Sequence, residues 1–176
     1  MKIDAGIIVN NPAEAGPAIK QLEDSGYDGA YSFEGAHDPF LPLVAAATNT
    51  SKIELITSIA VAFARNPMTL ANIGYDLNLA SQGRFILGLG SQIKPHITKR
   101  FSMPWSSPAA RMKEMVEAIN AIWDCWQNGT KLNYRGEFYT HTLMTPFFNP
   151  GPNPYGLPKI YVAAVGPLMT QAVSES

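Results

Sequence analysis

The sequence is poor in cysteine and has no long apolar run. Cys125 is its single cysteine among 176 residues. A disulfide framework is therefore excluded, and a reducing compartment, the cytoplasm, is the expected location. No stretch approaches the roughly 18 consecutive apolar residues of a membrane span. The first 16 residues also lack the cationic start and long apolar segment of a secretory signal. The sequence thus predicts a cytoplasmic protein with no membrane partner.

Charge is also scarce, with 15% charged residues and a formal net charge of -1. This balance gives no reason to expect a nucleic-acid partner. The 46% of hydrophobic residues is enough for the core of one globular unit. One segment is unbalanced, because no Asp or Glu occurs from Leu77 to Lys113. Its cations would form either a binding surface for an anionic ligand or an ordinary solvated face. They are Arg84, Lys94, Lys99, Arg100, Arg111 and Lys113.

Several common motifs are missing as well. No Ser-His-Asp arrangement or glycine-rich phosphate loop is present, and His96 and His141 have no cysteine or carboxylate at ligand spacing, so no metal site is predicted. The segment "GRFILGLGSQIKPHI" contains Gly88 and Gly90, but a dinucleotide fingerprint needs a further glycine at position 93, which is isoleucine. The two glycines instead remove side chains from a strand, so that a flat ligand or a neighbouring backbone can approach closely.

Strand and helix patterns alternate along the chain. Strands are predicted at 3–9, 27–34, 52–63, 84–90 and 159–165. Helices are predicted to begin at Asn11-Pro12, Asp38-Pro39, Asn66-Pro67 and Ser107-Pro108. Residues 130–158, rich in Pro, Gly and aromatics, are predicted to form a short hairpin and a long ordered loop inserted before the fifth strand. This alternation indicates right-handed βαβ units and an α/β fold with a parallel sheet.

Polar residues gather where these strands end, and active sites of parallel α/β folds form at the carboxyl ends of the strands. His37 is the best candidate for proton transfer, because a histidine ordinarily titrates near neutral pH. It would otherwise only order the turn before Asp38, the expected helix cap. Glu34 is either an acid or base or a carboxylate held by backbone amides. The other candidates at strand ends are Asn10, Ser58, Ile59, Ala60, Ser91, Gln92 and His96.

The stretches "LITSIAVAFARNPMTLA", "SQGRFILGLGSQIKPHI" and "KRFSMPWSSPAARMKEMVEAINAIW" resemble the bacterial-luciferase-like flavin and deazaflavin oxidoreductases, in particular the branch that depends on coenzyme F420. The resemblance continues through "FEGAHDPFLP" and "AAVGPLMT", so it extends over essentially the whole chain. It implies a TIM-type (β/α)8 barrel whose carboxyl-end cleft holds a flavin or deazaflavin ring. Barrels of this type usually need about 250 residues, so 1–176 would be an N-terminal part with only about the first five strands.

The resemblance also implies roles for residues. A non-prolyl cis peptide bond that supports the ring is expected at Ser58-Ile59. His37 and Glu34 are the expected catalytic residues. The expected cofactor-binding residues are Ser58, Ile59, Ala60, Gly90, Ser91, Gln92 and His96. The anionic end of F420 is expected at Lys94, Lys99, Arg100 or Arg111.

The implied activity is hydride transfer between F420 and a small organic substrate. An FMN-dependent luciferase-like monooxygenase is the alternative, because both cofactors suit the same cleft. A second alternative is a non-catalytic, truncated half-barrel that acts as a binding or oligomerisation module. Unpaired edges of an incomplete barrel would pair with other chains, so the expected partners are a second copy of the chain or a complementary barrel half.

Overall fold

The computed structural model describes residues 1–174, which form two compact units. The first unit contains Met1–Ala60, Ile73–Leu89 and Leu157–Tyr161. The second contains Val61–Asn72, Gly90–Gly156 and the residues from Val162 onward. Most of the parallel sheet belongs to the first unit, together with two of the helices predicted from the sequence.

The sheet is built on four parallel strands in the order β1, β2, β3, β5. Its register pairs Gly6 with Tyr31, Tyr31 with Ile56 and Ile56 with Ile86. Strands β4 and β8 complete the sheet, both beside β5. The bounds are β1 (Asp4–Gly6), β2 (Gly29–Ser32), β3 (Glu54–Thr57), β4 (Ala60–Val61), β5 (Phe85–Gly90) and β8 (Lys159–Val162). The predicted parallel sheet is confirmed, and the carboxyl ends of its parallel strands share one edge.

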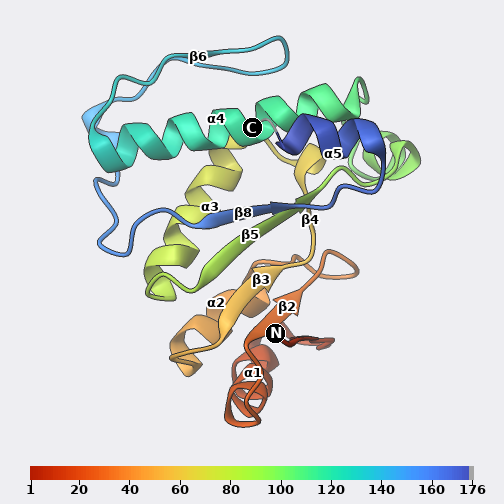
Figure 1. Ribbon diagram of the computed structural model, residues 1–176, viewed down its shortest axis with the longest axis vertical. Helices are drawn as coiled ribbons and strands as arrows, with labels where there is room; N and C mark the ends of the chain where they lie inside the picture. The colour runs from red at the N-terminus through yellow and green to blue at the C-terminus, as the bar shows by residue number, and fades with distance from the viewer. Residues whose placement is uncertain (175–176) are drawn as a thin grey trace. The chain divides into compact units, whose positions relative to one another are not determined.

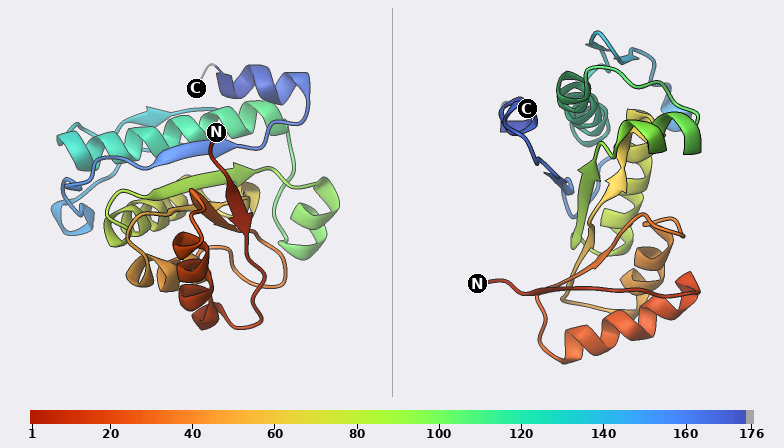
Figure 2. Two further views of the ribbon diagram at one scale, coloured as in Figure 1. Left: turned by 60° about the horizontal axis from the view of Figure 1, so that its bottom comes forward. Right: turned by 90° about the vertical axis from the view of Figure 1, so that its right-hand side faces the viewer.

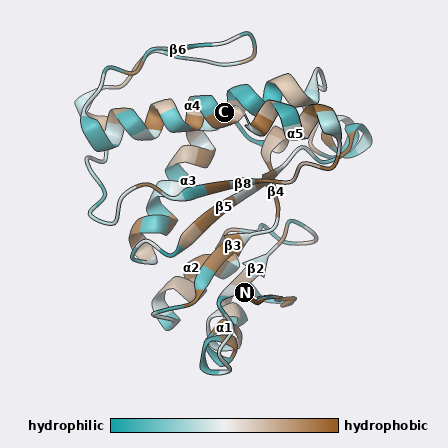
Figure 3. Cartoon of the chain, in the orientation of Figure 1, coloured by the Kyte–Doolittle hydropathy of each residue, from teal (hydrophilic) through white to brown (hydrophobic). Residues whose placement is uncertain are grey.

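The strands are shorter than the sequence predicted. The first was expected over 3–9 but covers Asp4–Gly6, and the segment 52–63 is divided between β3 and β4. The division falls at the peptide bond between Ser58 and Ile59, which is cis, as expected. Strand β5 is apolar along its length in Figure 3, and each of its residues is buried. Burial on both faces explains its continuous apolar pattern.

The α-helices of the first unit begin a few residues later than the sequence predicted. Helices α1 (Ala15–Asp24) and α2 (Leu41–Asn49) pack against each other (Figure 1). The Asn11 side chain accepts a hydrogen bond from the Ala13 N–H at 3.1 Å, at the start of the short 3-10 helix η1 (Pro12–Glu14). The Asp38 carboxylate accepts one from the Phe40 N–H at 2.8 Å. The predicted caps are therefore confirmed in part: Asn11 caps η1 rather than α1, and Asp38 bonds the turn that leads into α2, whose first capping position is Phe40.

Helix α3 (Pro67–Ala80) has its predicted cap as well, because the Asn66 side chain accepts from the Thr69 N–H at 2.9 Å. The prediction at Ser107 was only partly correct. Helix α4 (Pro108–Asn128) does begin there, but the Ser107 side chain makes no capping hydrogen bond and its backbone is left-handed, with φ 37°. The left-handed turn directs the chain into the helix without help from the hydroxyl group.

The second unit is organised around α4. Helix α5 (Pro167–Ser174) packs against α4 (Figure 2). The face of α4 predicted to form core is buried, and Met112, Ile119, Trp123 and Trp126 are each at most 2% exposed. The Trp123 indole N–H donates to the Ala71 carbonyl at 3.0 Å. Cys125, also on α4, is 3% exposed and only packs in the core, as expected.

The predicted hairpin forms between β6 (Tyr134–Arg135) and β7 (Thr140–His141), which pair antiparallel. The Glu114 carboxylate on α4 holds its connecting turn by accepting from the Glu137 and Phe138 N–H groups, both at 2.8 Å. The remaining short elements are η2 (Ala62–Ala64), the π-helix η3 (His96–Arg100) and η4 (Pro146–Phe148). Among the described residues, no helix is long and apolar enough to cross a membrane.

Arg84 joins three segments of the first unit. Its guanidinium donates to the carbonyls of Ala47, Thr50 and Ile53 at 3.2, 3.0 and 2.9 Å. Two of these carbonyls lie at the carboxyl end of α2, where helical carbonyls lack partners within the helix. One half-buried cation therefore closes the end of α2 and ties it to the chain that enters β3.

Glu23 has the matching role on the other side of the same loop. Its carboxylate accepts from the N–H groups of Ser51, Lys52 and Ile53 at 2.9, 2.6 and 3.0 Å. Burial opposes ionisation of this side chain, but the three backbone donors prevail and hold the pKa of Glu23 below its ordinary value. The ionised carboxylate therefore stabilises the contact between α1 and the loop before β3.

We expect Glu23→Gln to lower the free energy of unfolding by about 1–3 kcal/mol near pH 7, because the charged acceptor is lost. The folded-state pKa is depressed, so this stabilisation is present above the ordinary glutamate value of about 4.3 and is lost as the pH falls through the folded value. Denaturant unfolding of the parent protein and of Glu23→Gln between about pH 7 and pH 3 measures how their difference in unfolding free energy changes with pH. A stability difference that stays constant over this range would contradict the assignment.

Candidate functional site

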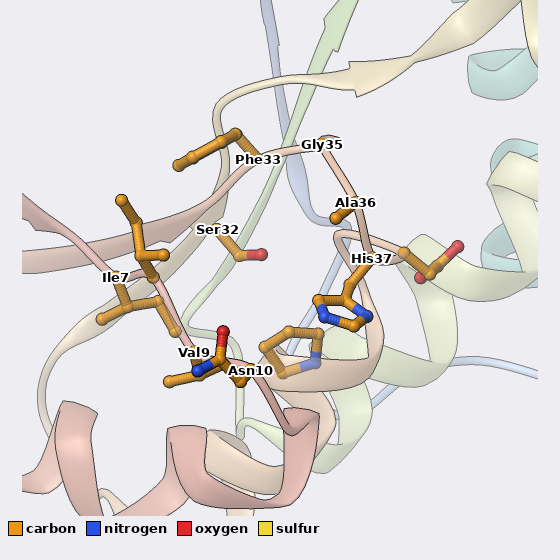
Figure 4. A pocket seen from close by; sticks show the side chains of 11 residues that line it. Ile7, Val9, Asn10, Ser32, Phe33, Gly35, Ala36 and His37 are labelled. Atoms are coloured by element: carbon orange, nitrogen blue, oxygen red, sulfur yellow. The ribbon is translucent and has the colours of Figure 1, made fainter.

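A cavity of about 130 Å³ lies in the first unit at the carboxyl ends of β1 and β2 (Figure 4). Chain segments 7–10 and 32–38 form most of its wall, and Pro42 of α2 completes it. The wall is mainly apolar, with Asn10, Ser32, His37 and Asp38 as its polar side chains. Apolar walls with a few convergent polar groups are typical of sites for small organic molecules.

The polar side chains of this cavity differ in their surroundings. His37 and Asn10 are exposed at its rim, whereas Ser32 is only 4% exposed. The carboxylate of Asp38 is bonded to the start of α2 and serves as a cap. Sequence reasoning selected His37 and Asn10 but missed Ser32, which precedes Glu34 by two residues in the predicted strand. Its polar character near the carboxyl end of a buried strand was the signal that would have found it.

The segment Ser58–Ala60 is held beside the end of β2. The Ser58 N–H donates to the Ser32 carbonyl at 2.7 Å, and the Glu34 N–H donates to the Ile59 carbonyl at 3.1 Å. The structure thus brings together the backbones of three predicted site residues, Glu34, Ser58 and Ile59. The backbone of Ser32, which the sequence analysis missed, lies with them. The catalytic and cofactor-binding roles of these residues stay predictions.

Gly88 makes room for a neighbouring backbone. A Cβ atom at this position would lie 1.7 Å from the Thr57 carbonyl oxygen, so no other residue fits without movement of β3 or β5. The Thr57 hydroxyl donates to the Gly88 carbonyl at 2.9 Å and accepts from the Gly88 N–H at 2.8 Å. Of the two explanations offered by the sequence, close approach of a backbone is the one that the structure supports at Gly88.

The other predicted residues lie in the second unit. Gly90 ends β5, and Gln92 follows with φ 58° and a side-chain oxygen that accepts from the Ile93 N–H at 3.0 Å. The Ser91 hydroxyl donates to the Gln92 carbonyl at 3.2 Å. His96 is exposed at the start of η3. Ser91 and Gln92 therefore shape their own turn, and the cofactor contacts expected of these residues stay predictions.

The basic segment is only partly available to an anionic ligand. Lys94, Lys99 and Arg100 are exposed on and near η3. Arg111 is only 8% exposed, and its guanidinium donates to the Tyr139 hydroxyl at 2.9 Å and to the Pro104 carbonyl at 2.8 Å. Of the four cations offered for the anionic end of the cofactor, Arg111 is thus the least accessible, because contacts within the second unit engage its side chain; the contact with the cofactor stays a prediction.

Within residues 1–174, no group of three or more His, Cys, Asp or Glu side chains is placed to hold a metal ion. The sequence model of a family described as luciferase-like monooxygenase matches residues 2–175. The chain belongs to the luciferase-like monooxygenase family.

Relatives from this comparison include an uncharacterized protein of Mycobacterium tuberculosis, 58% identical over 175 residues, which are 99% of this chain and 51% of that protein. A second is a 5,10-methylenetetrahydromethanopterin reductase of Archaeoglobus fulgidus, 30% identical over 161 residues, 89% of this chain and 45% of the relative. This luciferase-like chain therefore spans about half the length of the curated relatives it matches.

The solved structures that resemble the chain are also matched over only about half of their own length. A coenzyme F420-dependent tetrahydromethanopterin reductase of Methanopyrus kandleri matches 100% of the chain with a TM-score of 0.72 and 20% identity, over 54% of its own length. The oxygenating part of a 3,6-diketocamphane monooxygenase of Pseudomonas putida, in complex with FMN, matches 99% with a TM-score of 0.77 and 17% identity, over 56% of its length. The chain has the fold of part of a luciferase-like TIM barrel, as predicted.

We expect Gly88→Ala to destabilise the protein by about 1–3 kcal/mol, because the new methyl group overlaps the Thr57 carbonyl and pushes β3 and β5 apart. Gly35→Ala is the matched control, since a Cβ there makes only ordinary contact with the Phe33 ring at 3.4 Å. Thermal and denaturant unfolding measure the loss of stability in each of the two variants. Equal stability of the two would show that the approach at Gly88 is not a constraint.

Proposed function

We propose that this chain is part of an F420-dependent oxidoreductase that transfers a hydride between the deazaflavin and a small organic substrate. The observation that carries the proposal is the 30% identity over 161 residues to 5,10-methylenetetrahydromethanopterin reductase. The fold match to an F420-dependent reductase, and the cavity with His37 at its rim, support it further. The acid-free basic stretch around η3 agrees with a cofactor that carries a phosphate and a glutamate tail.

The residues of the first unit fit a heterocyclic cofactor and an organic substrate. The cavity wall is largely apolar, and the backbone of Ser58–Ala60 is fixed by its bonds to the Ser32 carbonyl and the Glu34 N–H. We propose that Ser58, Ile59 and Ala60 support the ring. In the second unit, Gly90, Ser91, Gln92 and His96 stay the proposed cofactor-binding residues.

When bound, F420 supplies hydride transfer at its C5 position. The chain supplies position and proton transfer. The His37 imidazole at the cavity rim is proposed to give or accept the proton of the substrate oxygen. The Glu34 carboxylate is the second proposed acid or base.

An FMN-dependent monooxygenase is the alternative, favoured by the match to an oxygenase solved with FMN. A non-catalytic half-barrel is a further alternative, since the chain spans about half of its relatives. We also propose that the protein is cytoplasmic and associates with itself or with a complementary barrel half. The large exposure of Ile3 and Ile8 near the outer strand β1, at 53% and 85%, supports such an association.

Fluorescence titration with F420 and with FMN tests the cofactor. We expect F420 to bind at least about tenfold more tightly than FMN, a difference of about 1.4 kcal/mol. Tighter binding of FMN would replace the proposal by the monooxygenase alternative. Submicromolar binding of neither would favour the non-catalytic module.

The basic segment is tested by combining Lys94→Gln, Lys99→Gln and Arg100→Gln. We expect weaker F420 binding and a smaller dependence of the affinity on salt, because exposed charges attract an anion through a screened interaction. Titrations at about 0.05 M and 0.5 M salt give both quantities.

The matched control removes the same charge elsewhere, with Lys20→Gln, Lys52→Gln and Lys131→Gln. These lysines are exposed or half-buried and lie outside the basic segment. The control should keep the affinity and its salt dependence. If the two triple variants behave alike, net charge rather than the segment governs binding, and the proposed contact is wrong.

A further inference from the structure

Ser32 contributes a polar side chain to the wall of the cavity of about 130 Å³ (Figure 4). The residue is 4% exposed, and within the described part of the chain its hydroxyl makes no hydrogen bond; only its carbonyl is engaged, by the Ser58 N–H. The hydroxyl oxygen is not fully enclosed by protein, so a molecule in the cavity can reach it. A ligand there can supply the hydrogen bond that the chain does not.

Among the described residues, no Lys or Arg contributes to the cavity wall. Its one ionisable acid, Asp38, is bonded to the N–H groups of Phe40 and Leu41. A carboxylate or phosphate would therefore enter without a counter-charge and beside an acid, which is unfavourable in an apolar site. An uncharged ligand meets no such penalty.

The size and the walls of the cavity limit the ligand further. A cavity of about 150 Å³ is known to hold benzene, so about 130 Å³ admits a group of nearly that size. Ile7, Val9, Phe33 and Pro42 offer apolar contact to such a group. A serine hydroxyl both donates and accepts, so it suits a carbonyl or a hydroxyl oxygen equally.

We propose that this cavity binds the reacting end of an uncharged organic substrate, an apolar group of about six carbon atoms with one carbonyl or hydroxyl oxygen hydrogen-bonded to Ser32. His37 and Asn10 stand at the open rim and contact the same oxygen or the atoms next to it. This inference rests on the proposed function only in that it treats the ligand as a substrate; the binding itself does not depend on F420.

The test is an NMR titration of the protein without cofactor, with cyclohexanone as the probe and the Ser32 and Phe33 amide signals as the readout. We expect saturable shifts with cyclohexanone and at least about tenfold weaker binding of cyclohexanecarboxylate. Ser32→Ala should weaken cyclohexanone binding about fivefold, the loss typical of one neutral hydrogen bond. Its Tm should not fall, because the removed hydroxyl has no internal partner.

Ser51→Ala, at an exposed serine outside the cavity, is the control and should leave the affinity unchanged. Equal binding of the carboxylate, an unchanged affinity in Ser32→Ala, or a lowered Tm in that variant would each overturn the proposal. Cyclohexanone binding without F420 binding would leave this inference intact and remove the proposed function, so the two failures are distinguishable.

Discussion

The close approach of β3 and β5 is the constraint on which the candidate site depends. At Gly88 the Thr57 carbonyl occupies the space of a side chain, and the Thr57 hydroxyl bonds both backbone groups of Gly88. The strand end that follows, Ser58–Ala60, is thereby held from one side by β5. It is held from the other side by the Ser32 carbonyl and the Glu34 N–H. A backbone bonded on both sides has little freedom, which suits the ring-supporting role that we propose for it.

Charged side chains bonded to backbone groups stabilise both units in the same manner. In the first unit Glu23 and Arg84 hold the loop between α2 and β3 from its two sides. In the second, Glu114 and Arg111 on α4 fix the β6–β7 hairpin through its turn and through Tyr139. Glu23, Arg84 and Glu114 are half-buried and Arg111 is buried, and each makes at least two hydrogen bonds; Glu23 also lies 3.8 Å from Lys20. Hydrogen bonds with charged side chains therefore order these two loops.

The cavity at the ends of β1 and β2 connects the family assignment with a specific chemistry. The chain belongs to the luciferase-like family, and the proteins that resemble it include both a reductase and a monooxygenase. The cavity combines a mainly apolar wall, a rim histidine and a serine hydroxyl that has no partner among the described residues. These features bear on the substrate that we propose, and they can be tested separately from the cofactor.

The sequence by itself determined the features that depend on neighbours along the chain. The side-chain hydrogen bonds of Asn11, Asp38 and Asn66 ahead of the helices, the buried face of α4 and the parallel direction of the strands were predicted from local patterns, because such bonds and helical faces involve residues within a few positions. The family and the fold of a partial barrel were also predicted, from stretches distributed over the whole chain. The tertiary structure decided the contacts of Thr57 and Arg111 and the place of Ser32 in the cavity wall. Their partners, or the space around them, come from segments about 10 to 30 residues away, and no local pattern reports which backbone fills a gap or which hydroxyl is left unpaired.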